Sequence, residues 1–221
     1  PRSNTSRRTP GCSTLAMTTD ALTNRRCVIT GASRGLGLEI ARLFLAQGAR
    51  LLLCARNLPI LDEAATQLRS QFPQAEIHTA AADVAVTADL DRLAETAQQV
   101  LGGVDVLVSN AGIHGPFGPL QKTDWDYWLH TVQVNLGGSA YAIRAFLPLL
   151  QQSERGKIVL LSGGGATKSR PFVTAYAVSK TAIVRLAETL ADEFRQQELS
   201  IDINAVAPGA MNTALLREII D

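Results

Sequence analysis

The chain alternates between short apolar runs and longer stretches with apolar residues at helical spacing, and this alternation restricts the folds open to it. The strand candidates are 27–30, 49–55, 76–83, 104–110, 156–162 and 200–207. The helix candidates between them are 35–47, 58–71, 87–101, 123–151 and 174–197. Continuous apolar strands interleaved with helices are typical of a parallel sheet covered on both faces. The sequence therefore predicts a doubly wound α/β sheet, in which ligands bind at the carboxyl ends of the strands.

A chain of 221 residues is long enough for one substantial core, and we expect a single domain over residues 25–221. Residues 1–24 precede the first strand and open with a segment rich in Arg, Ser, Thr and Pro that has no apolar stretch of the kind found in secretory signals. The chain begins with Pro1 rather than Met, and Met17 lies shortly before the first strand. We expect residues 1–24 to be a disordered or artefactual tail, with organellar targeting as the alternative.

Charge and cysteine content restrict the partners and the compartment. The net charge is +1, but residues 1–26 carry five arginines and one acid, which leaves 16 basic and 19 acidic residues in the remainder. A folded part of net charge −3 has no attraction for nucleic acid, and no apolar run approaches the length of a membrane span. Cys12, Cys27 and Cys54 lack metal-ligand spacing, so we predict no metal site and expect reduced, buried thiols in a cytoplasmic protein.

A glycine-rich loop, TGASRGLG at 30–37, follows the first strand and opens the first helix. Glycine permits a tight turn and close approach of the backbone to a ligand, and the start of a helix directs N–H groups and a positive dipole end at an anion. A glycine cluster alone is weak evidence, but its place between a strand and a helix indicates a dinucleotide site.

The end of the second strand reads CARN and bears on the choice of dinucleotide. An acid at this position binds the ribose 2′-hydroxyl of NAD, whereas a base accommodates the 2′-phosphate of NADP. The sequence has Arg56 here and Arg34 within the glycine loop, and both could reach that phosphate. NADP is therefore favoured over NAD, unless both arginines are only solvated surface residues.

Tyr176 and Lys180, in the segment TAYAVSK, lie four positions apart and share one face of a predicted helix. A neighbouring positive charge favours the phenolate and lowers the pKa of a tyrosine, which would suit it to exchange protons with a carbonyl or alcohol. The same spacing also arises by chance on amphipathic helices, so the pair alone does not establish chemistry.

Taken together, the motifs resemble those of the short-chain dehydrogenase/reductase (SDR) family, from about residue 25 to the end of the chain. The loop matches Thr-Gly-x-x-x-Gly-x-Gly, and YAVSK matches Tyr-x-x-x-Lys. The other matches are Asp83 after the third strand, NAG at 110–112 after the fourth, Asn135 within VQVNLGG, and APGAMNT at 207–213. This resemblance implies a Rossmann fold and hydride transfer between nicotinamide and a carbonyl or secondary alcohol.

The resemblance also implies roles for individual residues. Tyr176 would be the general acid/base, Lys180 would lower its pKa and bind the nicotinamide ribose, and Asn135 would link the site to solvent through a water. A serine near the end of the fifth strand would bind the substrate oxygen. The implied cofactor-binding residues are Gly31, Ser33, Arg34, Gly35, Leu36, Gly37, Arg56, Asp83, Val84, Asn110, Ala111, Gly112, Tyr176, Lys180, Pro208, Gly209 and Thr213.

The chain departs from the family pattern at two places. Many relatives have the serine thirteen residues before the tyrosine, where this chain has Gly163; we assign the role to Ser162, with Ser169 as a distant second. Family members also continue into a substrate-covering lid and a seventh strand, whereas this sequence stops at LLREIID. We therefore expect a C-terminally truncated chain or an incomplete substrate pocket.

The motifs are compatible with three functions. The leading hypothesis is an NADP-dependent oxidoreductase, and the alternative is a dinucleotide-binding protein without turnover. An epimerase or dehydratase is disfavoured, because extended relatives use another glycine spacing and a larger chain. By analogy with the family, we expect a homodimer or homotetramer.

His78 and His130 show no metal spacing, Trp125 and Trp128 are expected to pack, and His114 is either loop surface or a substrate contact.

Overall fold

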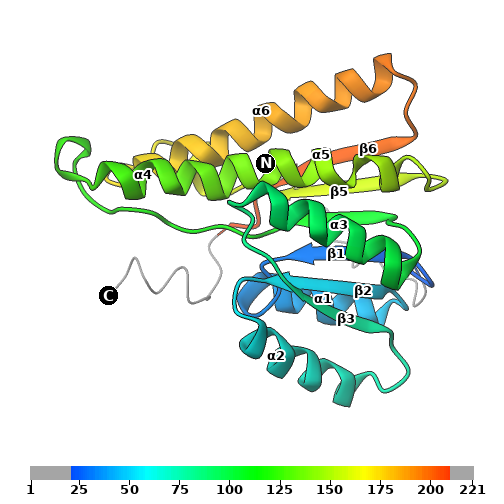
Figure 1. Ribbon diagram of the computed structural model, residues 1–221. Helices are drawn as coiled ribbons and strands as arrows, with labels where there is room; N and C mark the ends of the chain where they lie inside the picture. Colours follow the sequence, from blue (N-terminus) through cyan, green and yellow to red (C-terminus); the bar gives the residue numbers. More distant parts are fainter. Residues whose placement is uncertain (1–20, 210–221) are drawn as a thin grey trace, which may run out of the picture.

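The computed structural model describes residues 21–209, which form a parallel six-stranded sheet between two layers of helices (Figure 1). The strands run in the order β3-β2-β1-β4-β5-β6, and every neighbouring pair is parallel. Their bounds are β1 (Arg26–Thr30), β2 (Arg50–Ala55), β3 (Ile77–Ala81), β4 (Val106–Ser109), β5 (Gly156–Leu161) and β6 (Ile201–Val206). The predicted fold class is confirmed, and all six predicted strands are present.

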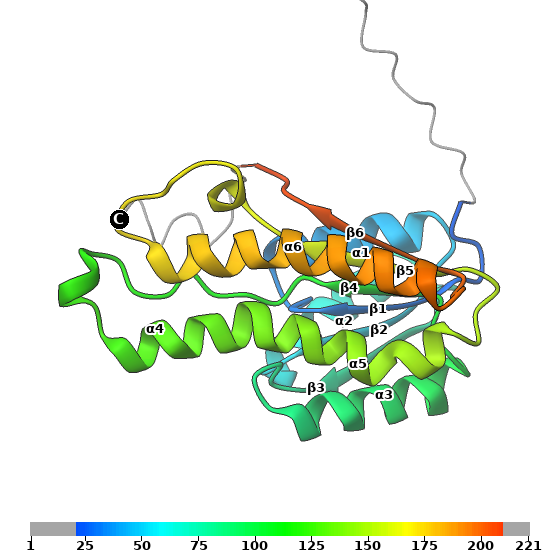
Figure 2. The ribbon, with the colours of Figure 1, turned by 90° about the horizontal axis from the view of Figure 1, so that it is seen from above.

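The helices also follow the prediction, with one interruption. Their bounds are α1 (Gly35–Ala46), α2 (Leu58–Gln71), α3 (Thr87–Leu101), α4 (Trp125–Val132), α5 (Gly138–Leu150) and α6 (Thr174–Gln196). The single helix expected over 123–151 is instead α4 and α5 joined by a π-helical turn, η2 (Gln133–Gly137). Figure 2 shows α4 and α5 as one nearly continuous rod that runs beside α6. Two short 3-10 turns, η1 (Leu120–Lys122) and η3 (Gly164–Ala166), complete the described elements.

Each face of the sheet has its own hydrophobic core. Leu51 and Leu53 of β2 pack with residues of α1 and α2, whereas Leu52 and Cys54 of the same strand pack with residues of α3. Helices α5 and α6 contribute to the same core as α3, which includes the fully buried Phe146. Successive side chains of a strand point to opposite faces, so a strand buried on both sides is apolar throughout. This explains the continuous apolar runs in the sequence.

The strand order changes direction between β1 and β4, and this change determines where a ligand can bind. From β1 the chain proceeds to β2 and β3 on one side, then crosses to β4, β5 and β6 on the other. The loops that follow β1 and β4 therefore diverge to opposite faces. In sheets of this kind the carboxyl ends of the strands at that point form a ligand-binding crevice.

A partly buried ion pair links the two central strands at the opposite, amino end of the sheet. One carboxylate oxygen of Asp105 accepts hydrogen bonds from the backbone N–H and Nε of Arg26, both at 2.9 Å. The other accepts from Arg26 Nη2 at 2.8 Å and from Ser153 Oγ at 2.6 Å. Burial by itself raises the pKa of Asp105, but the hydrogen bonds from Arg26 and Ser153 outweigh it and hold that pKa well below its usual range.

Cys27 and Cys54 are buried and free, and burial raises the pKa of both thiols, that of Cys54 to about 12. Both thiols therefore stay protonated at neutral pH, and the prediction of buried reduced thiols is confirmed for these two. Cys12 lies outside the described residues. Within residues 21–209, none of the helices combines the length and the apolar character needed to cross a bilayer.

We predict that Asp105→Asn lowers the free energy of unfolding by about 3 kcal/mol at pH 7, because it leaves Arg26 without its charged partner. The native pKa of Asp105 is depressed, so its contribution is present above about pH 4 and is lost as the pH falls below that value. Urea unfolding of both proteins at pH 7 and pH 3 should show the difference narrowing at the lower pH.

The control is Asp192→Asn, which removes an exposed partner of Arg195 within α6. It should change the free energy of unfolding by less than about 0.5 kcal/mol. Equal losses in the two variants would contradict the role assigned to Asp105.

Candidate active site

The loop between β1 and α1 is compressed against the end of β4. Gly31 and Gly35 have φ angles of +66° and +59°, a region that favours glycine. Asn110 Nδ2 donates to the carbonyl oxygens of Thr30 and Gly31 at 2.9 and 3.0 Å. A Cβ at Gly37 would overlap the carbonyl oxygen of Gly31 and lie 2.6 Å from Asn110 Nδ2. Glycine at these positions therefore allows the loop at residues 30–37, called here the glycine cradle, to pack directly against the end of β4.

Thr30 connects the ends of the same two strands. Its Oγ1 accepts hydrogen bonds from the backbone N–H groups of Asn110 and Ala111, both at 3.1 Å. Ser33 precedes the N-cap residue of α1, Arg34, and Leu36 is the second residue of that helix. Among the described residues, the side chain of Arg34 makes no cap hydrogen bond. The first N–H groups of α1 are thus not capped by that side chain, and they form the positive end of a twelve-residue helix.

The remaining predicted cofactor residues follow other strands of the sheet. Arg34 and Arg56 are exposed after β1 and β2, and neither takes part in the ion pairs formed within residues 21–209. Asp83 and the buried Val84 follow β3, and Asp83 Oδ1 accepts the N–H of Ala85 at 2.9 Å. Pro208 and Gly209 follow β6 and are exposed, whereas Thr213 lies outside the described residues.

Asn135 lies within the π-helical turn η2 and is fully buried. Its Oδ1 accepts the backbone N–H of Ile113 at 2.8 Å, and its Nδ2 donates to the carbonyl of Ile113 at 2.9 Å and to Ser179 Oγ at 3.1 Å. One side chain therefore joins the rod of α4 and α5, the segment after β4, and α6. Single π-helical turns occur frequently at functional sites.

Tyr176 and Lys180 lie on the first turns of α6, and the structure brings them together as their spacing predicts. Lys180 Nζ lies 5.8 Å from the centroid of the Tyr176 ring and donates to the carbonyl of Leu161 at 2.7 Å. Only 5% of Lys180 is exposed. A Cβ on Gly112 would lie 3.0 Å from Asn135 Oδ1 and 3.4 Å from Lys180 Nζ, so Gly112, Asn135 and Lys180 meet at one point.

The pKa of Tyr176 shifts in the direction opposite to the one predicted from the sequence. Burial raises the pKa of Tyr176, and the charge of Arg170 offsets part of this effect. Burial also lowers the pKa of Lys180 to about 8, so its ammonium form still predominates at neutral pH but does not bring the pKa of the phenol below its usual value. The phenol is therefore protonated at neutral pH and can donate a hydrogen bond or a proton.

The end of β5 places Ser162 and Gly163 in different environments. Ser162 is 5% exposed, and its Oγ donates to the backbone carbonyl of Lys180 at 2.7 Å. A Cβ at Gly163 would overlap the hydroxyl oxygen of Tyr176 and lie 3.1 Å from its Cζ. The backbone of Gly163, rather than the side chain of Ser162, thus faces the phenol. The assignment of Ser162 to catalysis stays a prediction, and Ser169 lies on the exposed loop.

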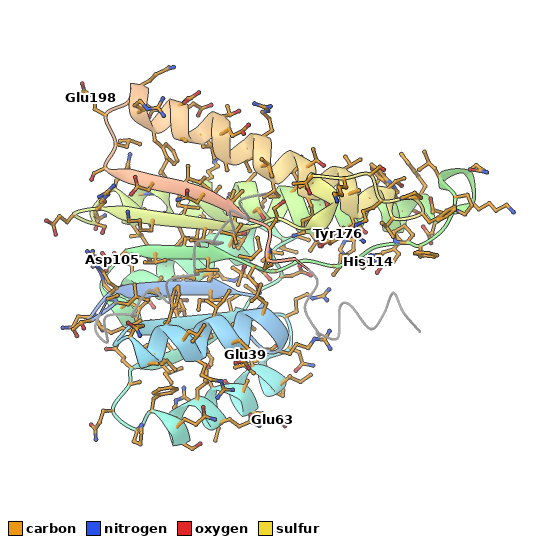
Figure 3. The ribbon with its side chains drawn as sticks, turned by 180° about the vertical axis from the view of Figure 1, so that it is seen from behind. Glu39, Glu63, Asp105, His114, Tyr176 and Glu198 are labelled. Carbon is orange, nitrogen blue, oxygen red and sulfur yellow. The ribbon has the colours of Figure 1, made fainter. Side chains whose placement is uncertain are left out.

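His114 is the residue whose position the sequence left open. It is 7% exposed, and its ring stacks on that of Tyr176 with the centroids 5.2 Å apart and the planes at 22°. Figure 3 shows both side chains at the carboxyl end of the sheet, away from Asp105. No spacing in the sequence signals this contact, because it joins the segment after β4 to the start of α6, two positions that are 62 residues apart.

The histidine and tryptophan side chains outside this site make structural contacts. His78 lies on the edge strand β3 and contacts Glu76 at 3.0 Å. Trp128 stacks on Trp125 with the centroids 5.0 Å apart, and its Nε1 donates to Thr174 Oγ1 at 3.0 Å. The two tryptophans therefore stack on each other, but Trp125 is 56% exposed, so its predicted packing is found only in part. The hydrogen bond from Trp128 joins α4 to the start of α6.

The chain belongs to the short chain dehydrogenase family, whose model matches residues 25–221. It is 31% identical over 198 residues to dehydrogenase/reductase SDR family member 4 of Pongo abelii, which covers 90% of this chain and 70% of that protein.

Solved structures agree with this assignment. A short chain dehydrogenase from Shigella flexneri complexed with NADP is 28% identical, with a TM-score of 0.83 over 91% of this chain and 83% of the other. An SDR protein from Burkholderia phymatum in complex with NAD is 29% identical, with a TM-score of 0.82 over 89% of this chain and 68% of the other.

We predict that Lys180→Met stabilises the protein at pH 7 by about 1 to 3 kcal/mol, because folding buries an ammonium group. The native pKa of Lys180, about 8, is below its unfolded value. The free-energy cost of burying the ammonium group is therefore largest below pH 8 and decreases as the pH approaches about 10.5. Denaturant unfolding at pH 7 and pH 10 should show the advantage of the variant shrinking at the higher pH. An advantage of the same size at both pH values would contradict this account.

Proposed function

We propose that the protein is an NADP-dependent oxidoreductase that transfers a hydride between nicotinamide and a carbonyl or secondary alcohol. The observation that carries the proposal is the convergence of Tyr176, Lys180 and Asn135 at the carboxyl end of the sheet, beside the glycine cradle. Family membership supports oxidoreductase chemistry. When bound, the cofactor supplies or accepts the hydride, and the protein aligns the reactants and handles the proton.

The proton chemistry follows from the environment of Tyr176. Because burial raises the pKa of Tyr176, its hydroxyl remains protonated at neutral pH and acts as the general acid toward a substrate carbonyl oxygen. As the proton leaves, the nearby ammonium of Lys180 stabilises the phenolate charge. This arrangement favours reduction of a carbonyl, and the same groups acting in reverse would oxidise an alcohol.

The cofactor contacts follow from the cradle and the strand ends. The N–H groups at the start of α1 and the backbone of Gly31, Gly35 and Gly37 would hold the pyrophosphate. Asp83 and Val84 would lie against the adenine, and Asn110, Ala111 and Gly112 would border the nicotinamide half. Lys180 would bind the nicotinamide ribose. Asn135 would hold the segment at Ile113 in place, in addition to its predicted role beside a water.

NADP is proposed over NAD because two arginines follow β1 and β2, whereas an acid would be expected for NAD. We expect saturating NADPH to raise the thermal midpoint of the protein clearly more than NADH does, since a ligand that binds the folded state stabilises it. In the double variant Arg34→Ala/Arg56→Ala the two nucleotides should give similar shifts.

The control for this measurement is Arg195→Ala, near the far end of α6, which should leave both shifts unchanged. Equal shifts from NADPH and NADH in the unaltered protein would contradict the NADP assignment. The absence of any shift with either nucleotide would contradict dinucleotide binding itself.

The activity is tested by NADPH oxidation with carbonyl probes, namely isatin, 2,3-butanedione and ethyl acetoacetate. We expect Tyr176→Phe to lower kcat/KM by at least about 100-fold, because it removes the general acid. The matched control is Tyr141→Phe on α5. The hydroxyl of Tyr141 donates to Asp91 at a distance of 3.1 Å and lies away from the site, so this variant should retain activity. Comparable activity in the two variants would contradict the role of Tyr176.

A second candidate is a dinucleotide-binding protein without turnover. The bond from Ser162 Oγ to the Lys180 carbonyl favours it, because that hydroxyl is directed away from the phenol. This candidate predicts the thermal shift with NADPH but no oxidation of NADPH by any of the three probes. The homodimer or homotetramer expected from the family stays a prediction.

A further inference from the structure

The position at which relatives have a serine contributes no hydroxyl in this chain. The Cα of Gly163 faces the hydroxyl of Tyr176, and a Cβ there would overlap it. The neighbouring hydroxyl of Ser162 is buried and bonded to the Lys180 carbonyl at 2.7 Å. A developing negative charge on a substrate oxygen is best stabilised by donors that are already in place. A second side-chain donor beside Tyr176 would therefore have to come from a position other than 162 or 163.

His114 has the chemistry and the position for such a donor. An imidazole carries one N–H donor in its neutral form and two when charged. The ring is 93% buried and stacks on the phenol of Tyr176 at a centroid distance of 5.2 Å. In Figure 3 it lies at the junction of the segment after β4 and the start of α6.

The backbone on either side of His114 is held in place. Before it, both polar backbone groups of Ile113 are bonded to the side chain of Asn135. After it, Gly115 has a φ of +79° and packs so closely on Thr131 that a Cβ would overlap the Thr131 hydroxyl. Thr131 is in turn fixed by donating to the carbonyl of Tyr127 at 2.7 Å. Catalytic donors require this kind of support from surrounding residues.

We propose that His114 is a catalytic residue that donates a hydrogen bond to the substrate oxygen alongside Tyr176, in place of the hydroxyl that Gly163 lacks. The inference rests on the proposed carbonyl reduction and deepens it. In this arrangement Tyr176 delivers the proton, and His114 binds the same oxygen and stabilises the charge that develops as the hydride arrives at the carbonyl carbon.

The test separates the polar role of the ring from its packing role. His114→Phe keeps an aromatic ring on Tyr176 but removes both nitrogens, whereas His114→Asn and His114→Gln remove the ring but keep an N–H donor. The assay is NADPH oxidation by the full 221-residue chain with isatin, 2,3-butanedione and ethyl acetoacetate. NADPH binding is measured in parallel by thermal shift. His78→Asn, on the far edge strand, is the matched control.

We expect His114→Phe to lower kcat by about 100-fold with an unchanged NADPH shift, which is the loss seen when one such donor is removed. At least one of the two amide variants should retain activity within about tenfold of the unaltered protein, and His78→Asn should match it.

The opposite pattern overturns the inference. Activity of His114→Phe within about threefold of the unaltered protein would assign only a packing role to the ring. Losses in both amide variants as large as the loss in His114→Phe would contradict the hydrogen-bond donor role. The proposed function fails in a different way: the unaltered protein then oxidises no NADPH with any probe, or Tyr176→Phe is as active as Tyr141→Phe. The inference about His114 falls in those cases as well.

Discussion

A parallel sheet is stable only when helices cover both of its faces, and the rest of this structure follows from that constraint. Each strand must be followed by a crossover helix before the chain can return to the sheet. All strand ends of one kind therefore lie along one edge, and residues distant in sequence meet there. Because the order reverses between β1 and β4, the loops after these two strands leave to opposite faces. The glycine cradle and the Tyr176 site adjoin at that point.

The charged groups at the two ends of the sheet differ in how they affect the stability of the fold. At the amino end, Asp105 accepts hydrogen bonds from Arg26 and Ser153, and these bonds lower its pKa. At the carboxyl end, Lys180 is buried with a pKa lowered to about 8 and is bonded to one carbonyl oxygen. Such a lysine is destabilising to the fold. Binding and catalytic sites commonly retain groups of this kind at the expense of stability.

The site also shows how one position can change the surroundings of a side chain on a shared fold. Family membership explains the sheet, the cradle and the pairing of Tyr176 with Lys180, but not the absence of a side chain at position 163. Gly163 leaves room that the phenol occupies, and the burial of His114 places a second polar ring against that phenol. Function depends on such local details rather than on the fold.

Much of the fold could be predicted from the sequence, because strands and helices have characteristic apolar periods and glycines indicate tight turns. The order of motifs along the chain likewise indicated the cradle and the pair at Tyr176 and Lys180. The π-helical turn at Asn135 escaped prediction, because it differs from an α-helix in hydrogen bonding and not in apolar pattern.

The sequence by itself determined the strands and most of the helices, the glycine-rich loop after β1 and the pair of residues four apart on α6. Only the tertiary structure decided the direction of the Tyr176 pKa, the side of β5 that Ser162 faces, and the contact of His114 with the phenol. These properties depend on burial and on packing between segments far apart in the chain. Local periodicity carries no information about either.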